Sequence, residues 1–230
     1  MEMKFKGILL DLDNTLYPYQ ITHQQAISTV TAAVSGKFSI DEDTIEKAFK
    51  EARQEIHTAL SETAASHNRL LYFQRMFEHL KINPMKYAMH AYNIYWDTFL
   101  EKMKPYDNAY DFLELVKDRK ICILSDLTAH IQYRKIEKLG LSGYAGYLVT
   151  SEEAGKEKPH PWIFRLALEK MGFTVNEVCM IGDSFSKDIA GAANLGIYSF
   201  WMNTEGEKEK LNEITAEIRT FKELITYFHE

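Results

Sequence analysis

Two aspartates near the N-terminus are the residues of this sequence whose types and spacing are best suited to chemistry. Asp11 and Asp13 directly follow the largely apolar residues 5–10, which predict a buried parallel strand. Acids at the carboxyl end of such a strand lie where open α/β sheets bind their ligands. Because two carboxylates held at one spot repel each other, a divalent cation is the usual compensation. A solvated acidic turn would also explain the pair, so the choice depends on the rest of the chain.

Polar residues also follow the later apolar segments or lie in the loops after them. These residues are Ser125, Asp126, Lys158, Asp183 and Asp188. The carboxyl ends of parallel strands share one edge of a sheet, so we expect all of these side chains to lie around Asp11 and Asp13. The convergence of three polar turns and a lysine at one edge favours a functional site over a solvated turn.

The elements that must position these residues alternate in type through the second part of the chain. Apolar runs predict strands over residues 120–124, 146–149, 177–181 and 197–201. Helical spacing predicts helices over about residues 107–118, 129–139, 161–171, 188–195 and 221–228. Strands that alternate with helices in this way indicate an α/β fold, a doubly wound parallel sheet with right-handed crossovers.

Four amphipathic helices are predicted between the first strand and this alternating part. Apolar residues recur at helical spacing over about residues 21–38, 41–56, 70–80 and 84–99, which is the pattern of helices with one buried face. We therefore expect an all-helical domain at residues 17–104, inserted into a core formed by residues 1–16 and 105–230. Aromatic residues of its last helix, such as Tyr95 and Trp96, are interpreted as bundle core, with a pocket lining as the alternative.

Length, charge and composition narrow the class of protein. The 230 residues are 46% hydrophobic and 26% charged, as in ordinary globular proteins. The net charge of −6, with no basic tract, argues against nucleic acid or an anionic membrane as the main partner. No apolar run reaches the roughly 18–20 residues of a membrane span. Residues 1–4 lead straight into a strand rather than a signal peptide, so a cytoplasmic protein is expected. Cys122 and Cys179 lack metal-ligand spacing and are interpreted as core thiols.

The polar residues of the strand ends also occur in the order of a known set of motifs. The sequence resembles the haloacid dehalogenase-like (HAD) superfamily in four motifs: Asp11-x-Asp13-x-Thr15, Ser125 after a strand, Lys158-Pro159 before a helix, and Gly182-Asp183-(x)4-Asp188. The helical insertion between the first two motifs resembles the all-helical type 1 cap of this superfamily. The resemblance implies a HAD-like Rossmannoid core and a hydrolase of the phosphatase branch.

The resemblance implies a role for each residue of the first motif. Asp11 would be the nucleophile and form an aspartyl-phosphate by in-line attack. Asp13 would protonate the leaving alcohol and then act as a base toward the water that hydrolyses the intermediate, while Thr15 would support the pair. Mg²⁺ would be held by the Asp11 carboxylate, the Asp13 backbone carbonyl and Asp183. The charge balance of the site also favours a bound cation, because a phosphate dianion would lie among several aspartates with only one lysine to offset their negative charge.

The remaining motif residues are implied to bind phosphate or to support the site. The Ser125 hydroxyl and the Asp126 N–H would hold the phosphate, and Lys158 would screen the transferring oxygens. Asp188 would assist the metal or orient Lys158. Asp126 departs from the family pattern, because this position is commonly Asn. Its extra charge must point away from phosphate, pair with a cation such as Lys187, or help to select the substrate.

Asp13 also bears on which reaction of the superfamily is expected. Dehalogenases of the superfamily lack the second aspartate of the first motif, since they have no leaving alcohol to protonate, so Asp13 favours phosphate transfer. We therefore expect a Mg²⁺-dependent phosphomonoester hydrolase that acts on a small soluble phosphorylated metabolite. A phosphotransferase or mutase with the same intermediate and a 2-haloacid dehalogenase are the enzyme alternatives. A phospho-accepting receiver or a non-catalytic binding module is the alternative from another class, and the sequence leaves the oligomeric state open.

Overall fold

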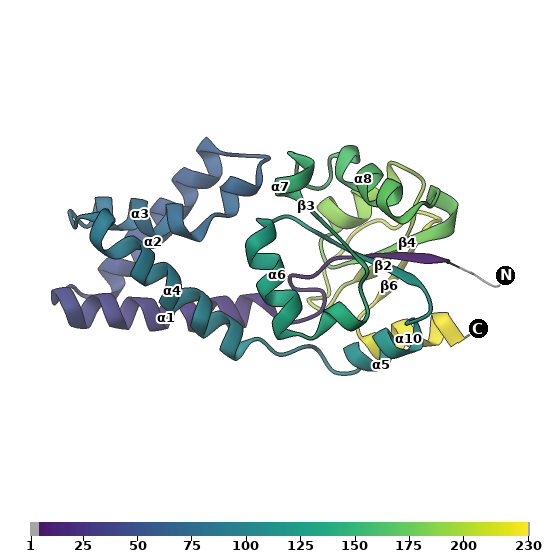
Figure 1. The fold of residues 1–230 in the computed structure, drawn as a ribbon, viewed down its shortest axis with the longest axis horizontal. Helices are drawn as coiled ribbons and strands as arrows, with labels where there is room; N and C mark the ends of the chain where they lie inside the picture. Colours follow the sequence, from purple (N-terminus) through teal and green to yellow (C-terminus); the bar gives the residue numbers. More distant parts are fainter. Residues whose placement is uncertain (1–4, 230) are drawn as a thin grey trace. The chain divides into compact units, whose positions relative to one another are not determined.

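A computed structural model describes residues 5–229 of the chain, which form two compact units (Figure 1). One unit consists of Tyr19–Met103 and is called the helical unit. The other consists of the chain up to Pro18 together with the chain from Lys104 onward, and is called the sheet unit. No helix within residues 5–229 combines the length and apolar character needed to cross a bilayer.

The sheet unit contains a six-stranded sheet in the order β3-β2-β1-β4-β5-β6, and all of its neighbouring strands are parallel. The strands are β1 Gly7–Leu10, β2 Lys120–Ser125, β3 Tyr147–Thr150, β4 Val178–Gly182, β5 Tyr198–Met202 and β6 Thr215–Ile218. The predicted α/β fold class is confirmed. β6 was not predicted, because it is a short edge strand whose residues are mostly incompletely buried, so its sequence lacks the apolar run of a central parallel strand.

The register of the central strands brings their carboxyl ends level. Leu10 at the end of β1 pairs with Ile123 of β2 on one side and with Ile181 of β4 on the other. The Asp11 N–H continues this pairing by donating to the Ile181 carbonyl at 2.9 Å. The polar residues that follow the three strands therefore leave the sheet at one edge, where the topology of such sheets places ligands.

Helices cover both faces of this sheet. They are α5 Ala109–Leu115, α6 Ala129–Lys138, α7 Ser151–Ala154, α8 Pro161–Met171, α9 Ala190–Ala193 and α10 Phe221–His229, with short turns η2 Leu141–Gly143, η3 Val175–Glu177 and η4 Phe185–Ile189. On one face Phe164 of α8 belongs to a buried cluster with Leu9 of β1. On the other face Phe228 of α10 contacts both Phe112 of α5 and Phe200 of β5. Because both faces are covered, the central strands β1 and β4 are buried along their whole length.

The helical unit is built from α1 Tyr19–Phe38, α2 Glu42–Ala59, α3 Arg69–His79 and α4 Pro84–Lys102, with the short turn η1 Ala64–His67 before α3. Within it α4 packs against both α1 and α3, and α3 packs against α2. Local sequence determines where these helices begin. The Asp41 carboxylate caps α2 by accepting from the Thr44 N–H at 3.2 Å, and Pro84 occupies the first turn of α4.

The aromatic residues of α4 are packed inside the helical unit. Tyr95, Trp96 and Phe99 are each at most 1% exposed. This burial agrees with their interpretation as bundle core, since rings that lined an open pocket would be partly exposed.

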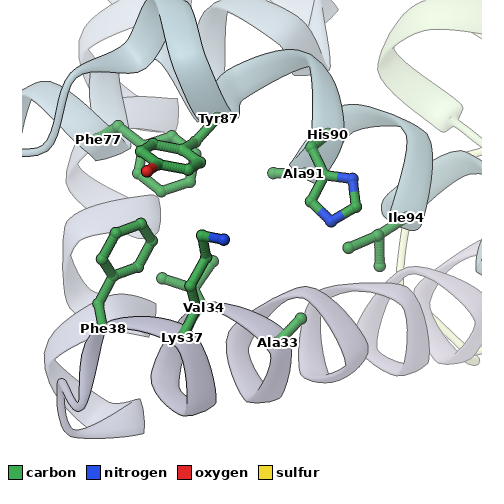
Figure 2. Close-up of a pocket in the computed structure, with 9 residues that line it drawn as sticks. All are labelled: Ala33, Val34, Lys37, Phe38, Phe77, Tyr87, His90, Ala91 and Ile94. Carbon is green, nitrogen blue, oxygen red and sulfur yellow. The ribbon is translucent and has the colours of Figure 1, made fainter.

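A small hollow lies between α1, α3 and α4 (Figure 2). The rings of Phe38, Phe77 and Tyr87 lie together on one side of it, and the Lys37 ammonium lies 5.2 Å from the centre of the Tyr87 ring. Its volume of about 40 Å³ is close to the share of one water molecule and far below the roughly 300 Å³ of a ligand pocket. The hollow is therefore a packing defect rather than a metabolite site.

Candidate active site

Asp11 lies in the middle of the carboxyl edge of the sheet. It follows β1, which is paired on both sides, and the residue is only 5% exposed. Its Oδ1 accepts a hydrogen bond from the Lys158 ammonium at 2.7 Å, and its Oδ2 accepts one from the Thr15 hydroxyl at 2.8 Å. The carboxylate is therefore held in one orientation by a donor on each oxygen.

Lys158 is the buried cation of this site. Its ammonium lies 2.7 Å from Asp11 Oδ1 and 2.7 Å from Asp188 Oδ1, and it donates to the Leu124 carbonyl at 3.0 Å. Burial disfavours the charged form, yet the Asp11 and Asp188 carboxylates outweigh it and raise the pKa of Lys158 well above its ordinary value. Lys158 is therefore protonated at neutral pH.

Three carboxylates surround this lysine and exceed its charge. One oxygen each from Asp11, Asp183 and Asp188 lies within 4.8 Å of the others. Burial, with repulsion between the acids, raises the pKa of Asp11 to about 7 and the pKa values of Asp183 and Asp188 to about 6. Burial is the main cause of these raised pKa values, repulsion between the acids adds to it, and Lys158 offsets only part of the effect. Clustered carboxylate oxygens are the ligands that a hard divalent cation takes, so the residues present fit Mg²⁺.

Asp188 reaches this cluster from the π-helical turn η4. Ser184 precedes the turn, and its N–H donates to Asp188 Oδ2 at 3.0 Å. Gly182, at the end of β4, leaves the space that Asp188 occupies, because a Cβ at this position would lie 2.5 Å from Asp188 Cγ. The glycine of the fourth motif is thus required by packing at the site.

Asp13 is held by residues that the sequence analysis did not assign to the site. The Lys135 ammonium lies 2.5 Å from Asp13 Oδ1, the Tyr17 hydroxyl donates to the same oxygen, and the Gln132 amide donates to Oδ2 at 3.0 Å. Burial raises the pKa of Asp13, but Lys135, Tyr17 and Gln132 together outweigh it and lower the pKa below its ordinary value. The structure therefore describes the ionised form of Asp13.

The sequence of α6 indicates that two of these residues, Gln132 and Lys135, are buried. Ile131 and Ile136 mark the buried face of the helix, and Gln132 and Lys135 fall on the same face. Buried polar side chains need buried hydrogen-bond partners. The positions of Gln132 and Lys135 therefore predict a polar partner beneath α6. Tyr17 had no such signal, because a packed linker and a site residue look alike at the end of the first motif.

The second-motif residues are also tied to their neighbours. Ser125 Oγ, at the end of β2, accepts from the Gln132 amide at 2.5 Å. Asp126 Oδ1 accepts from the Lys158 backbone N–H at 2.8 Å, and Oδ2 lies 3.1 Å from the Lys187 ammonium. The pairing of Asp126 with Lys187 considered from the sequence is present. Lys187 compensates the extra charge of Asp126, and the hydrogen bond from the Lys158 N–H to Asp126 fixes the loop that carries Lys158.

Asn14 is a further residue of the site that the sequence analysis did not assign. Its backbone is left-handed, with φ of 69°, a conformation that Asn adopts more readily than most residues. Its side-chain amide donates to Asp183 Oδ2 at 2.9 Å, and the Thr15 hydroxyl lies 3.3 Å from Asp183 Oδ1. The turn after β1 thereby connects the first motif to the fourth.

This arrangement matches a known family. The family model for haloacid dehalogenase-like hydrolases matches residues 5–196. The chain belongs to this family. The resemblance inferred from the four motifs is therefore confirmed, and the matched residues of the HAD family include all of the carboxylates and lysines described above.

Two phosphatases and one solved HAD phosphatase resemble this chain over most of its length. The ribulose-1,5-bisphosphate 5-phosphatase of Halopiger xanaduensis is 34% identical over 207 residues, which are 88% of this chain and 87% of the relative. The glyceraldehyde 3-phosphate phosphatase of Methanopyrus kandleri is 29% identical over 195 residues, or 84% and 81% of the two chains. The crystal structure of a HAD phosphatase from Thermococcus onnurineus superposes with a TM-score of 0.76 at 25% identity and covers 96% of both chains.

Proposed function

We propose that this HAD-family protein is a Mg²⁺-dependent phosphomonoester hydrolase that acts on a small soluble metabolite. The observation that carries the proposal is the Asp11 carboxylate, oriented on both oxygens by Lys158 and Thr15 within a cluster of acids. The relatives support the same class of reaction, because those from Halopiger xanaduensis and Methanopyrus kandleri are phosphatases of ribulose-1,5-bisphosphate and glyceraldehyde 3-phosphate. We assign substrate selection to the helical unit, which has the sequence position of the type 1 cap.

The proposed Mg²⁺ would be held by the carboxylates of Asp11 and Asp183 and the backbone carbonyl of Asp13, with Asp188 in support. When bound, it would neutralise the acids and the phosphate oxygens together. Lys158 supplies one positive charge against three carboxylates, so it cannot do this alone.

In the first chemical step, an oxygen of Asp11 forms a bond to phosphorus as the bond from phosphorus to the ester oxygen breaks. Asp13 enters this step protonated and gives its proton to the leaving oxygen, so that a neutral alcohol departs. The Ser125 hydroxyl and the Asp126 N–H hold the phosphate oxygens, and Lys158 screens their charge.

In the second step, water attacks the phosphorus of the aspartyl-phosphate. The ionised Asp13 removes a proton from this water, the bond between the Asp11 oxygen and phosphorus breaks, and inorganic phosphate leaves. The contacts of Asp13 with Lys135, Gln132 and Tyr17 describe the ionised form that this step requires.

The experiment that tests the proposal is a panel of phosphate esters, assayed for inorganic phosphate with and without Mg²⁺. The panel contains sugar phosphates, sugar bisphosphates, triose phosphates and nucleoside monophosphates. We expect Mg²⁺-dependent release from at least one class, and loss of this release in Asp11→Asn. Asp118→Asn is the matched control, because it makes the same change at an exposed aspartate of the sheet unit.

Three results would contradict the proposal. One is phosphate release that persists in Asp11→Asn, and another is release that needs no divalent cation. The third is halide release from 2-haloacids without phosphate release, which would assign the protein to the dehalogenases. Transfer of the phosphoryl group to an added alcohol, in place of water, would identify a phosphotransferase.

A further inference from the structure

Gln132 is a fully buried amide that contacts two parts of the candidate active site. It lies on α6 and is 0% exposed. Its Nε2 donates to Ser125 Oγ at 2.5 Å and to Asp13 Oδ2 at 3.0 Å. A side-chain amide carries two N–H donors, so each of these oxygens takes one of them. One nitrogen atom thus connects the residue proposed to bind phosphate with the residue proposed to protonate the leaving group.

Asp13 determines which way the Gln132 amide faces. An ionised carboxylate only accepts hydrogen bonds, and the other oxygen of Asp13 already accepts from the Lys135 ammonium and the Tyr17 hydroxyl. The Gln132 amide must therefore present its NH₂ group, rather than its carbonyl, to Asp13. The reverse orientation would place the carbonyl oxygen of Gln132 against the Asp13 carboxylate, and the two oxygens would repel each other.

The orientation of this amide also determines what the Ser125 hydroxyl can do. A hydroxyl group has one O–H donor and accepts through its lone pairs. Because Gln132 donates to Ser125 Oγ, this oxygen is the acceptor, and its own hydrogen is left for another partner. Within residues 5–229, the Ser125 hydroxyl hydrogen has no acceptor. Ser125 is the last residue of β2, so this hydrogen is available to an anion at the carboxyl edge of the sheet.

The carbonyl of Gln132 indicates that this side chain is not present for packing alone. In the described part of the chain, its Oε1 is buried and has no hydrogen-bond partner. An unpaired buried polar atom destabilises a protein, and an apolar side chain of similar volume would avoid that cost. Ile131 and Ile136 show that apolar residues fill the rest of this buried face. The two contacts of Nε2 therefore account for an amide at this position.

Contacts at both ends of α6 hold Gln132 in place. At the start of the helix the Glu152 carboxylate accepts from the Ala129 N–H at 2.8 Å, and at its end the Tyr110 hydroxyl donates to the Leu139 carbonyl at 3.0 Å. Groups carried by a fixed helix keep their spacing more precisely than groups carried by loops. The Gln132 amide is therefore suited to holding two active-site residues at a constant separation.

We propose that Gln132 is a positioning residue for phosphate binding, which directs the Ser125 hydroxyl hydrogen toward a phosphate oxygen and aligns this hydroxyl with Asp13. The alignment serves one phosphoryl group, because the ester oxygen that Asp13 protonates is bonded to the same phosphorus whose oxygens Ser125 holds. Gln132 acts through these two residues and does not itself contact the substrate. The proposal rests on the proposed phosphatase function of the same site.

The first experiment is calorimetric titration of the full-length protein with inorganic phosphate in the presence of Mg²⁺. Gln132→Met keeps most of the volume and removes both N–H donors. We expect phosphate to bind about three- to ten-fold more weakly, as for the loss of one hydrogen bond. Glu137→Met is the matched control, because it introduces the same side chain at an exposed position of the same helix. Its phosphate affinity should equal that of the wild type.

The second experiment is a double-mutant cycle that tests whether Gln132 acts through Ser125. Ser125→Ala lacks the hydroxyl, so adding Gln132→Met to it should change the phosphate affinity by less than about two-fold. A residue that only packs α6 would instead weaken binding by the same factor in both backgrounds. The same cycle is measured on kcat/KM for p-nitrophenyl phosphate, whose leaving group departs without a proton from Asp13. The kinetic cycle decides if Ser125→Ala binds phosphate too weakly for calorimetry.

Equal phosphate affinity in the wild type and Gln132→Met overturns the proposal, as do independent losses from Gln132→Met and Ser125→Ala or a wild type that binds no phosphate. If Gln132→Met does not fold by circular dichroism, Gln132→Asn replaces it, because its amide is one methylene too short to reach both oxygens. Its phosphate affinity should also fall, and an unchanged affinity overturns the proposal. Absence of activity on every ester would contradict the phosphatase proposal alone, because the calorimetric result does not depend on turnover.

Discussion

Lys135 provides the sharpest test of how the structure positions the catalytic acid. Its side chain is fully buried on α6, and its ammonium lies 2.5 Å from Asp13 Oδ1. Lys135→Met keeps most of the volume and removes the charge. Asp13 then retains only the weaker donors Tyr17 and Gln132, so we expect it to lose its orientation toward the leaving group.

The size of the effect follows from the lost contact. A hydrogen bond between charged groups contributes about 1.5–3 kcal/mol. Because the Asp13 side chain is 26% exposed, solvent screens part of this interaction, and the lower end of the range applies. About 1.5 kcal/mol corresponds to a roughly ten-fold fall in kcat/KM.

The assay compares two kinds of leaving group. An alkyl phosphate needs a proton on its departing oxygen, whereas p-nitrophenolate departs without one, so we expect the loss in Lys135→Met to be larger for alkyl phosphates. Lys138→Met is the control on the same helix, since Lys138 is exposed and should leave both rates unchanged. Melting curves confirm that each variant is folded. Equal losses for both esters, or no loss at all, would refute the positioning role of Lys135.

Three further predictions concern the pH dependence of stability, the binding of Mg²⁺ and the packing at Gly182. Burial and Arg69 lower the pKa of His23 in the folded protein to about 3. As the pH falls below about 6.5, the His23 imidazole is therefore protonated in the unfolded state but not in the folded state, and the free energy of unfolding decreases. The stability advantage of the wild type over His23→Gln should shrink by about 1.4 kcal/mol between pH 8 and pH 5.5 in urea unfolding, and a constant difference would contradict this. Burial raises the pKa values of Asp183 and Asp188 to about 6, so these carboxyl groups are ionised and able to bind Mg²⁺ at pH 8 but largely protonated at pH 5.5. Mg²⁺ should therefore raise the melting temperature more at pH 8 than at pH 5.5, and EDTA should reverse this increase. Gly182→Ala should abolish phosphate release in a folded protein, because its Cβ would displace Asp188, and full activity would refute this packing argument.

The positions of Asp11, Ser125 and Asp183 were determined by the sequence itself. Each follows an apolar run, and the alternation of these runs with amphipathic helices predicts parallel strands, whose carboxyl ends share one edge of the sheet. The structure accordingly places Asp11 and Asp183 in one cluster, with Asp188 and Lys158 beside them. Sequence patterns predicted this part of the site, because a helix between successive strands acts as a crossover connection and makes the strands parallel.

The environment of Asp13 was decided only by the tertiary structure. The sequence placed Asp13 beside Asp11, but its partners Gln132 and Lys135 come from a helix more than a hundred residues away in sequence. Their meeting depends on how α6 is rotated on the sheet, which no local pattern specifies. The same reason applies to Arg69, which directly precedes the helix predicted over residues 70–80 and was given no role from the sequence. Its burial among the aromatic rings of α1 and α4 exists only once three helices pack together.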